Sequence, residues 1–226
     1  MKLSILISSI ILLLFLTTSG AHSNTDSLVF NAQFIGWTGM NFGNTSVQQA
    51  GGRFLPELFY QHPLRAKLKM DVDLALNAFT SIQLKKWNYS DDNSSLQLYR
   101  ASVRLSSEQW ELRAGLQKLS FGSATLLRPL MWFDSNDPRD PLNLTNGVYG
   151  LLGRYYFLNN GNIWAWGLVG NKDPRGWDAV PTLKKQPEYG GRVQWPFLHG
   201  EIGLTFNHRQ PGTTKPYLPD QRTLFL

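Results

Sequence analysis

The feature that most constrains the fold of this chain is a stretch of strict alternation between apolar and charged residues. From Leu64 to Leu74, every even-numbered residue is apolar and every odd-numbered residue is charged. Successive side chains of a β-strand point to opposite faces, so the stretch predicts a strand with one apolar face and one charged face. Soluble β-sandwiches also contain such strands, and the alternation alone does not separate them from membrane barrels.

Two alternating segments, Tyr99–Leu105 and Trp110–Leu116, flank the polar turn Ser106–Gln109. Folding about that turn puts the apolar residues of both segments on one face. It also places Arg104 opposite Glu111 on the other face, and opposite charges in such a pair stabilise a hairpin. The two segments agree about which face is apolar, so the sequence predicts a β-hairpin here.

Two later pairs of segments repeat this pattern. The turn of one is Asn159–Asn162, which contains residues that tolerate a positive φ, and the turn of the other is Pro196–Glu201. The expected neighbours are Phe157 with Trp164 and Tyr155 with Trp166 in the first pair, and Gly191, Val193 and Trp195 with Phe206, Leu204 and Ile202 in the second. Aromatic residues near the turns are typical of the interfacial girdles of membrane barrels.

The order of loop lengths points in the same direction. We expect strands at 28–36, 52–60, 64–86, 96–106, 109–118, 148–158, 163–170, 188–196 and 201–209. Long connections (37–51, 87–95, 119–147 and 171–187) alternate with short ones (61–63, 107–108, 159–162 and 197–200). Transmembrane barrels have short turns on one side and long loops on the other. The sequence therefore predicts an all-β fold, a transmembrane antiparallel up-and-down β-barrel, and the odd strand count predicts that the barrel is truncated at the C-terminus.

The first 23 residues read as a secretory signal peptide. Lys2 is followed by an apolar run, Ile5–Leu16, which is too short to span a bilayer, and then by small and polar residues. We expect residues 24–226 to be the N-terminal part of a barrel exported to the outer membrane of a Gram-negative bacterium. The chain has no cysteine, which excludes disulfides and thiolate chemistry, and 13% of its residues are aromatic.

The polar faces of the expected strands would line the lumen. Their basic residues are Arg65, Lys67, Lys69, Arg100, Arg104, Arg113, Arg154 and Arg192, and their acidic residues are Asp71, Asp73, Glu111, Glu188 and Glu201. This excess of positive charge favours anions in a pore. Two other interpretations stay open: Arg104 and Glu111 as a purely structural pair, and the remaining bases as a solvated face.

The connection 119–147 is too long and too apolar for an ordinary exposed loop. We expect it to fold back into the barrel and narrow the pore. The predicted constriction residues are Trp132, Asp134, Asp137, Arg139 and Asp140. The spacing of Asp134, Asp137 and Asp140 also fits an oxygen-ligand Ca²⁺ site, but aspartates of proline-rich turns cap backbone as often, and we predict no metal.

The segment Leu112–Gly122 resembles outer-membrane porins of the alginate-export type. In those proteins an R-x-G-x-Q strand leads into an FG or YG turn and a long loop, and here Arg113, Gly115 and Gln117 precede Phe121-Gly122. The resemblance is strongest over residues 97–170. It implies a passive channel with a basic interior for anionic, often carbohydrate, substrates.

We therefore predict a porin-like channel for passive diffusion or export of small anionic or carbohydrate solutes, with outer-membrane lipid as the other partner. Neither nucleic acid nor a cofactor is expected. None of the four histidines has a triad or metal-pair spacing and no Gly-rich phosphate loop occurs, so we predict that the protein is not an enzyme. The alternatives are a non-conducting barrel acting as adhesin or scaffold, and a soluble periplasmic β-sandwich that binds sugars. The oligomeric state stays open.

Overall fold

A computed structural model describes residues 8–18, 26–41, 47–65, 67–85, 88–121, 132–134, 144–171, 175, 178, 182–183 and 185–212. Its strands are β1 (Ser8–Thr18), β2 (Ser27–Asn41), β3 (Val47–Arg65), β4 (Leu68–Lys85), β5 (Asn88–Ser106), β6 (Trp110–Gln117), β7 (Val148–Tyr156), β8 (Asn162–Leu168), β9 (Glu188–Phe197) and β10 (Gly200–His208). The described part contains no helix, and so none that is long and apolar enough to cross a membrane.

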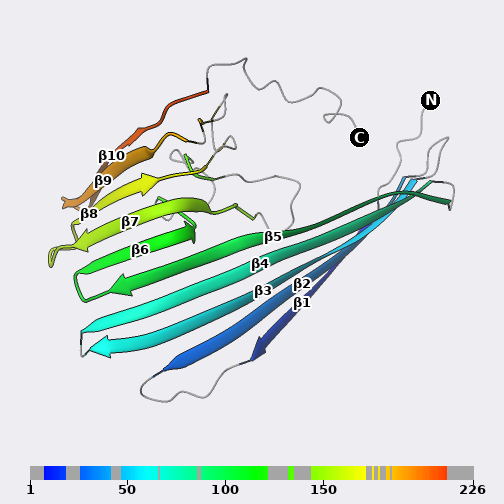
Figure 1. Cartoon of the computed structure of the whole chain (residues 1–226), viewed down its shortest axis with the longest axis horizontal. Helices are drawn as coiled ribbons and strands as arrows, with labels where there is room; N and C mark the ends of the chain where they lie inside the picture. Colours follow the sequence, from blue (N-terminus) through cyan, green and yellow to red (C-terminus); the bar gives the residue numbers. More distant parts are fainter. Residues whose placement is uncertain are drawn as a thin grey trace. The chain divides into compact units, whose positions relative to one another are not determined.

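The strands follow one another across an antiparallel, up-and-down sheet, in the order β1 to β10 (Figure 1). Each strand is hydrogen-bonded to the next one in the sequence, with no crossover connection. The predicted all-β, up-and-down arrangement is confirmed. A Greek-key sandwich would place non-consecutive strands side by side, so this order excludes that topology.

Several predicted strand ends are wrong. The expected long connections 37–51 and 87–95 are mostly strand, because β2 reaches Asn41 and β5 begins at Asn88. The predicted connection 61–63 belongs to β3, which continues to Arg65, and Lys67 is in the turn that precedes β4. Backbone pairing needs no apolar side chains, so these polar stretches continue the ladder beyond the point where the hydrophobic pattern ends. Pro63 is accommodated within β3.

The first strand lies inside the expected signal peptide. Ser8–Thr18 pairs with β2, from Ser8 opposite Met40 to Thr18 opposite Phe30. Its sequence differs from that of the other strands, because residues 10–16 are all apolar and do not alternate. Cleavage of a leader concerns processing of the chain and stays a prediction.

The chain forms two compact units, one made of residues 1–62 and 71–101 and the other of residues 63–70 and 102–226. In the first unit, β2 and β3 carry Phe30 opposite Leu58 and Phe34 opposite Phe54 on one exposed face. On the other face Trp37 lies over Gly51, where a Cβ atom would be 2.3 Å from the indole. Trp37 also stacks on Phe79 of β4 at 5.4 Å.

The second unit contains β6 to β10, and its strands have an apolar face and a polar face. The apolar face carries Trp110, Leu112, Tyr149, Leu151, Tyr155, Ile163, Tyr189, Val193, Trp195, Ile202, Leu204 and Phe206, all exposed. The polar face includes Glu111, Gln117 and Glu188, all buried. Polarity is thus reversed relative to a water-soluble sheet in one respect: the face that is exposed is the apolar one, and charged side chains are buried on the other.

The registers of two hairpins in this unit can be compared with those that the sequence predicts. Between β9 and β10, Gly191 pairs with Phe206, Val193 with Leu204 and Trp195 with Ile202, and the prediction is confirmed. Between β7 and β8 the prediction is wrong: Trp164 pairs with Arg154, and Trp166 pairs with Leu152. Both tryptophans therefore lie on the polar face. The turn spans 157–161 because Phe157 leaves the strand and packs edge-on against Trp195, with ring centroids 5.4 Å apart.

The hydrophobic core of the second unit lies on its polar face. Leu152, Trp166 and Leu168 of β7 and β8 pack there against residues that follow β6. The whole cluster is Leu119, Phe121, Phe133, Val148, Leu152, Trp166 and Leu168, with Trp132 and Trp164 at its margin. The described parts of the connection 118–147 thus cover the polar face of the strands.

Candidate functional site

A row of five side chains crosses the polar face of the second unit, one from each of five neighbouring strands. The register places Glu111 (β6), Arg154 (β7), Trp164 (β8), Arg192 (β9) and Thr205 (β10) directly beside one another. We call these five residues the charged row. Two arginines flank a tryptophan in it, with a carboxylate at one end and a hydroxyl at the other.

The first half of the charged row is a compact ionic cluster. Arg154 Nη1 lies 2.8 Å from Glu111 Oε1, and Arg104 Nη1 of β5 lies 3.9 Å from Glu111 Oε2. The Arg154 guanidinium lies over the Trp164 ring, with Cζ 3.8 Å from the ring centroid. The expected contact between Arg104 and Glu111 is present, although Arg154 is the closer partner of the carboxylate.

The second half of the charged row has neutral partners. Gln194 Oε1 accepts hydrogen bonds from Arg192 Nε at 3.3 Å and from Nη2 at 3.2 Å, and Thr205 Oγ1 accepts one from Nη1 at 3.4 Å. The Arg192 guanidinium also lies 5.7 Å from the Phe121 ring and 5.9 Å from the Trp164 ring. Such cation–π contacts orient a guanidinium without neutralising its charge.

A second row of residues lies beside the charged row on the same face. Its members are Leu152, Trp166, Gly190 and Asn207, again one from each strand. The Trp166 indole lies across Gly190, and its Nε1 donates a hydrogen bond to Asn207 Oδ1 at 3.0 Å. Because a glycine has no side chain, the indole can span from β8 to β10 while lying flat on the sheet.

The connection between β6 and β7 contributes aromatic residues to this face. Phe121 contacts Trp164 at 5.7 Å and Trp166 at 5.2 Å, and Phe133 meets Trp166 edge-on at 5.8 Å. Of the predicted constriction residues, Trp132 packs edge-on against Phe121 and Asp134 is buried. Asp137, Arg139 and Asp140 lie outside the described residues, so the Ca²⁺ alternative stays untested there. Among the residues that are described, no group of potential metal ligands gathers.

The connection between β8 and β9 is tied to the same face by a buried ion pair that the sequence analysis missed. Arg175 Nη2 donates to both carboxylate oxygens of Glu188, at 2.7 and 2.6 Å, and the two side chains are only 7% and 2% exposed. The Arg175 guanidinium also lies 5.5 Å from the Phe133 ring. The two long connections therefore meet at Arg175. A lone arginine among polar loop residues gives no signal of such a pairing.

A second ion pair joins this connection to the end of β10. Arg209 Nη2 lies 3.0 Å from Asp178 Oδ1, and the Asp178 backbone amide donates to the Arg175 carbonyl at 2.9 Å. Burial raises the pKa of the Asp178 carboxyl above its ordinary value, while the charges of Arg209 and Arg175 and a hydrogen bond from the Arg175 amide oppose this. The connection is thus attached at Arg175 and again at Asp178.

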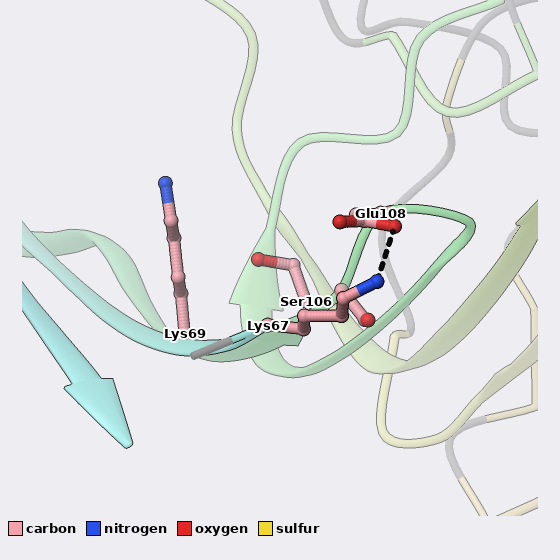
Figure 2. A pocket seen from close by; sticks show the side chains of 5 residues that line it. Lys67, Lys69, Ser106 and Glu108 are labelled. Atoms are coloured by element: carbon pink, nitrogen blue, oxygen red, sulfur yellow. Dashed lines mark hydrogen bonds and ion pairs between the residues drawn. The ribbon is translucent and has the colours of Figure 1, made fainter. Parts of the chain in front are cut away.

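Three of the predicted lumen residues lie elsewhere. Arg65, Lys67 and Lys69 are exposed around the turn between β3 and β4. Figure 2 shows Lys67 reaching Glu108 of the turn between β5 and β6, with a Nζ to Oε2 distance of 3.4 Å, while Lys69 points away from this pair. Both lysines line a pocket of about 350 Å³ with Ser106, Ser107 and Glu108. Because Lys67 is in a turn, the alternation through residues 64–74 does not describe one strand.

The remaining predicted lumen residues are on the strands themselves. Arg113 lies on β6 beside Leu152, on the polar face of the second unit. Arg100 is buried in the first unit, where it interacts electrostatically with Asp73 and Glu57. The structure thus brings Arg104, Arg154 and Arg192 together in the second unit, while Arg100 belongs to a separate ionic group in the first.

Comparison with known proteins does not add a family. No protein-family model, no curated protein and no solved structure matches the chain.

Proposed function

We propose that this chain forms an outer-membrane β-barrel that serves as a passive channel for small anionic or carbohydrate solutes. The observation that carries the proposal is the reversed polarity of the sheet. Large apolar side chains occupy the exposed face, with Leu204 73% and Phe206 61% exposed, while the carboxylates of Glu111 and Glu188 are buried on the opposite face.

The energetics favour an apolar medium on the exposed face. Covering apolar surface contributes about 25 cal/mol per Å², or about 2 kcal/mol for a fully buried leucine or phenylalanine. A water-soluble protein would gain this by burying Leu204, Phe206 and their neighbours. Lipid tails would supply the same gain without any further protein. Backbone N–H and C=O groups without hydrogen-bond partners cost several kcal/mol each in lipid. Insertion would therefore require the two edges of the sheet to pair, so that the sheet closes into a barrel.

A channel accounts for the polar face better than a solid scaffold does. Charged and amide side chains such as Arg154, Arg192 and Gln194 are suited to a hydrated path, where water satisfies the donors that the protein leaves open. The long connections on this face, held by Arg175 and Phe133, would narrow the path. The resemblance to alginate-export porins supports the same class of solute, while a non-conducting adhesin or scaffold barrel is the main alternative.

Two measurements on the protein test the proposal. First, the protein should fractionate with outer membranes and show a heat-dependent shift in gel mobility, because folded barrels resist detergent. Recovery in the soluble periplasm would overturn the barrel. Second, the purified protein should give stepwise conductance in planar bilayers. A membrane-inserted protein without conductance would favour the scaffold.

A further inference from the structure

The two arginines of the charged row differ in how their charges are balanced. Arg154 faces the Glu111 carboxylate on the strand before it, at 2.8 Å. The corresponding position on the other side of Arg192 is Thr205, which has no charge. Arg192 therefore hydrogen-bonds only neutral oxygens among the residues that the structure describes.

Contacts with neighbouring residues fix the position of the Arg192 guanidinium. Gln194 accepts from two of its nitrogen atoms, and the Gln194 amide itself donates to the Glu201 carboxylate, so this amide separates the acid from the arginine. Gly203 leaves space beneath the guanidinium, since a Cβ atom there would be 3.2 Å from Nη2 and 3.5 Å from Cζ. The Phe121 and Trp164 rings border the other sides.

A guanidinium in this position retains both its charge and part of its hydrogen-bonding capacity. Arginine stays protonated at every physiological pH, and its side chain has five N–H donors. Three of them are used by Gln194 and Thr205, which leaves donors on both terminal nitrogen atoms. Arg192 is half-buried, so water screens its charge less than it screens the exposed Lys67 and Lys69.

We infer that Arg192 is the residue that gives the path its preference for anions, by offering open N–H donors to a passing carboxylate or other oxyanion. The inference rests on the proposed channel function. A role for Arg192 alone replaces the prediction that many basic residues act together. Arg104 and Arg154 share the Glu111 carboxylate and Arg175 is paired with Glu188, so much of the positive charge of these three arginines is compensated.

The test is the reversal potential of single channels in a KCl gradient. The unaltered protein should be more permeable to Cl⁻ than to K⁺, and Arg192→Gln should move the permeability ratio about 2-fold or more toward unity. Arg192→Lys keeps the charge and should keep the preference. Lys118→Gln, which removes an exposed charge outside the row, is the matched control and should leave the ratio unchanged.

A second variant leaves the arginine in place. Thr205→Glu puts a carboxylate beside Arg192, as Glu111 stands beside Arg154, and should remove the anion preference to a similar extent. This variant decides the question if Arg192→Gln does not fold.

The possible results separate the two proposals. A conducting protein whose anion preference survives both Arg192→Gln and Thr205→Glu would overturn the role of Arg192 and leave the channel intact. An unaltered protein that conducts without any anion preference would also overturn the role of Arg192 and leave the channel function intact. A protein that inserts but never conducts would overturn both.

Discussion

Gly190→Ala tests the idea that the polar face is assembled around large rings lying across glycines. A Cβ atom at Gly190 would be 2.3 Å from the Phe206 carbonyl oxygen of β10 and 2.6 Å from Cε2 and Cζ2 of Trp166. The carbonyl belongs to a hydrogen-bonded strand and cannot rotate away, so the strand and the indole would both have to move by about 1 Å, an overpacking that costs typically 1–3 kcal/mol.

We expect a loss near the upper end of that range, about 3 kcal/mol, because moving Trp166 also strains its hydrogen bond to Asn207. The matched control is Gly167→Ala. A Cβ atom at Gly167, on the apolar face, would meet nothing within 4 Å, and alanine should stabilise the strand by about 0.5 kcal/mol relative to glycine.

Urea unfolding in detergent micelles, followed by tryptophan fluorescence, measures both variants. Trp166 is only 3% exposed, so its displacement should also shift the emission of the folded Gly190→Ala protein toward the red. The packing argument would be refuted if Gly190→Ala and Gly167→Ala differed by less than about 0.5 kcal/mol, the scatter of ordinary surface substitutions.

Other substitutions test the remaining features. Glu188→Gln should lower the free energy of unfolding by about 3–5 kcal/mol in the same urea titration, because Arg175 would stay buried without its ionic partner. Replacing both Arg175 and Glu188 by methionine should restore most of this free energy. Leu204→Arg should destabilise the protein in lipid vesicles by about 2 kcal/mol if its face meets lipid; an unchanged or more soluble protein would indicate a water-exposed sheet. Leu198 has a φ of 52° in the turn between β9 and β10, a conformation that strains a leucine by about 1 kcal/mol and that asparagine adopts more easily. Leu198→Asn should therefore raise the thermal midpoint of unfolding, and a lower midpoint would contradict this reading of the turn.

The register of β9 and β10 could be predicted from the sequence because apolar and polar residues alternate on both strands and a short turn joins them. The same reasoning failed for β7 and β8. Their size and apolar character predict that Trp164 and Trp166 lie on the apolar face, yet they pack against Arg154 and Phe121 on the polar face. Residue type alone does not distinguish a tryptophan facing outward from one under a loop.

The candidate site was only partly predictable. The sequence identifies Arg154 and Arg192 as polar-face residues. It cannot show that Glu111 neutralises Arg154 or that Thr205 lies beside Arg192, because these neighbours depend on the registers of four consecutive strand pairs. The Arg175–Glu188 pair joins residues that are separated by a loop, and no periodic pattern connects them. The hydrophobic pattern predicts strands that are too short where polar residues, such as those at the start of β5, continue the hydrogen-bonded ladder.

The reversed polarity of the sheet has a consequence for how the chain would reach its folded state. In water, pairing these strands would bury the core on the polar face but leave Leu204, Phe206 and the other exposed apolar side chains hydrated, so the hydrophobic effect would supply only part of its stabilisation. The remaining part would arise only at the moment when an apolar medium covers that face. Completion of folding would then coincide with membrane entry, and until that event the chain would depend on being held apart from other copies of itself.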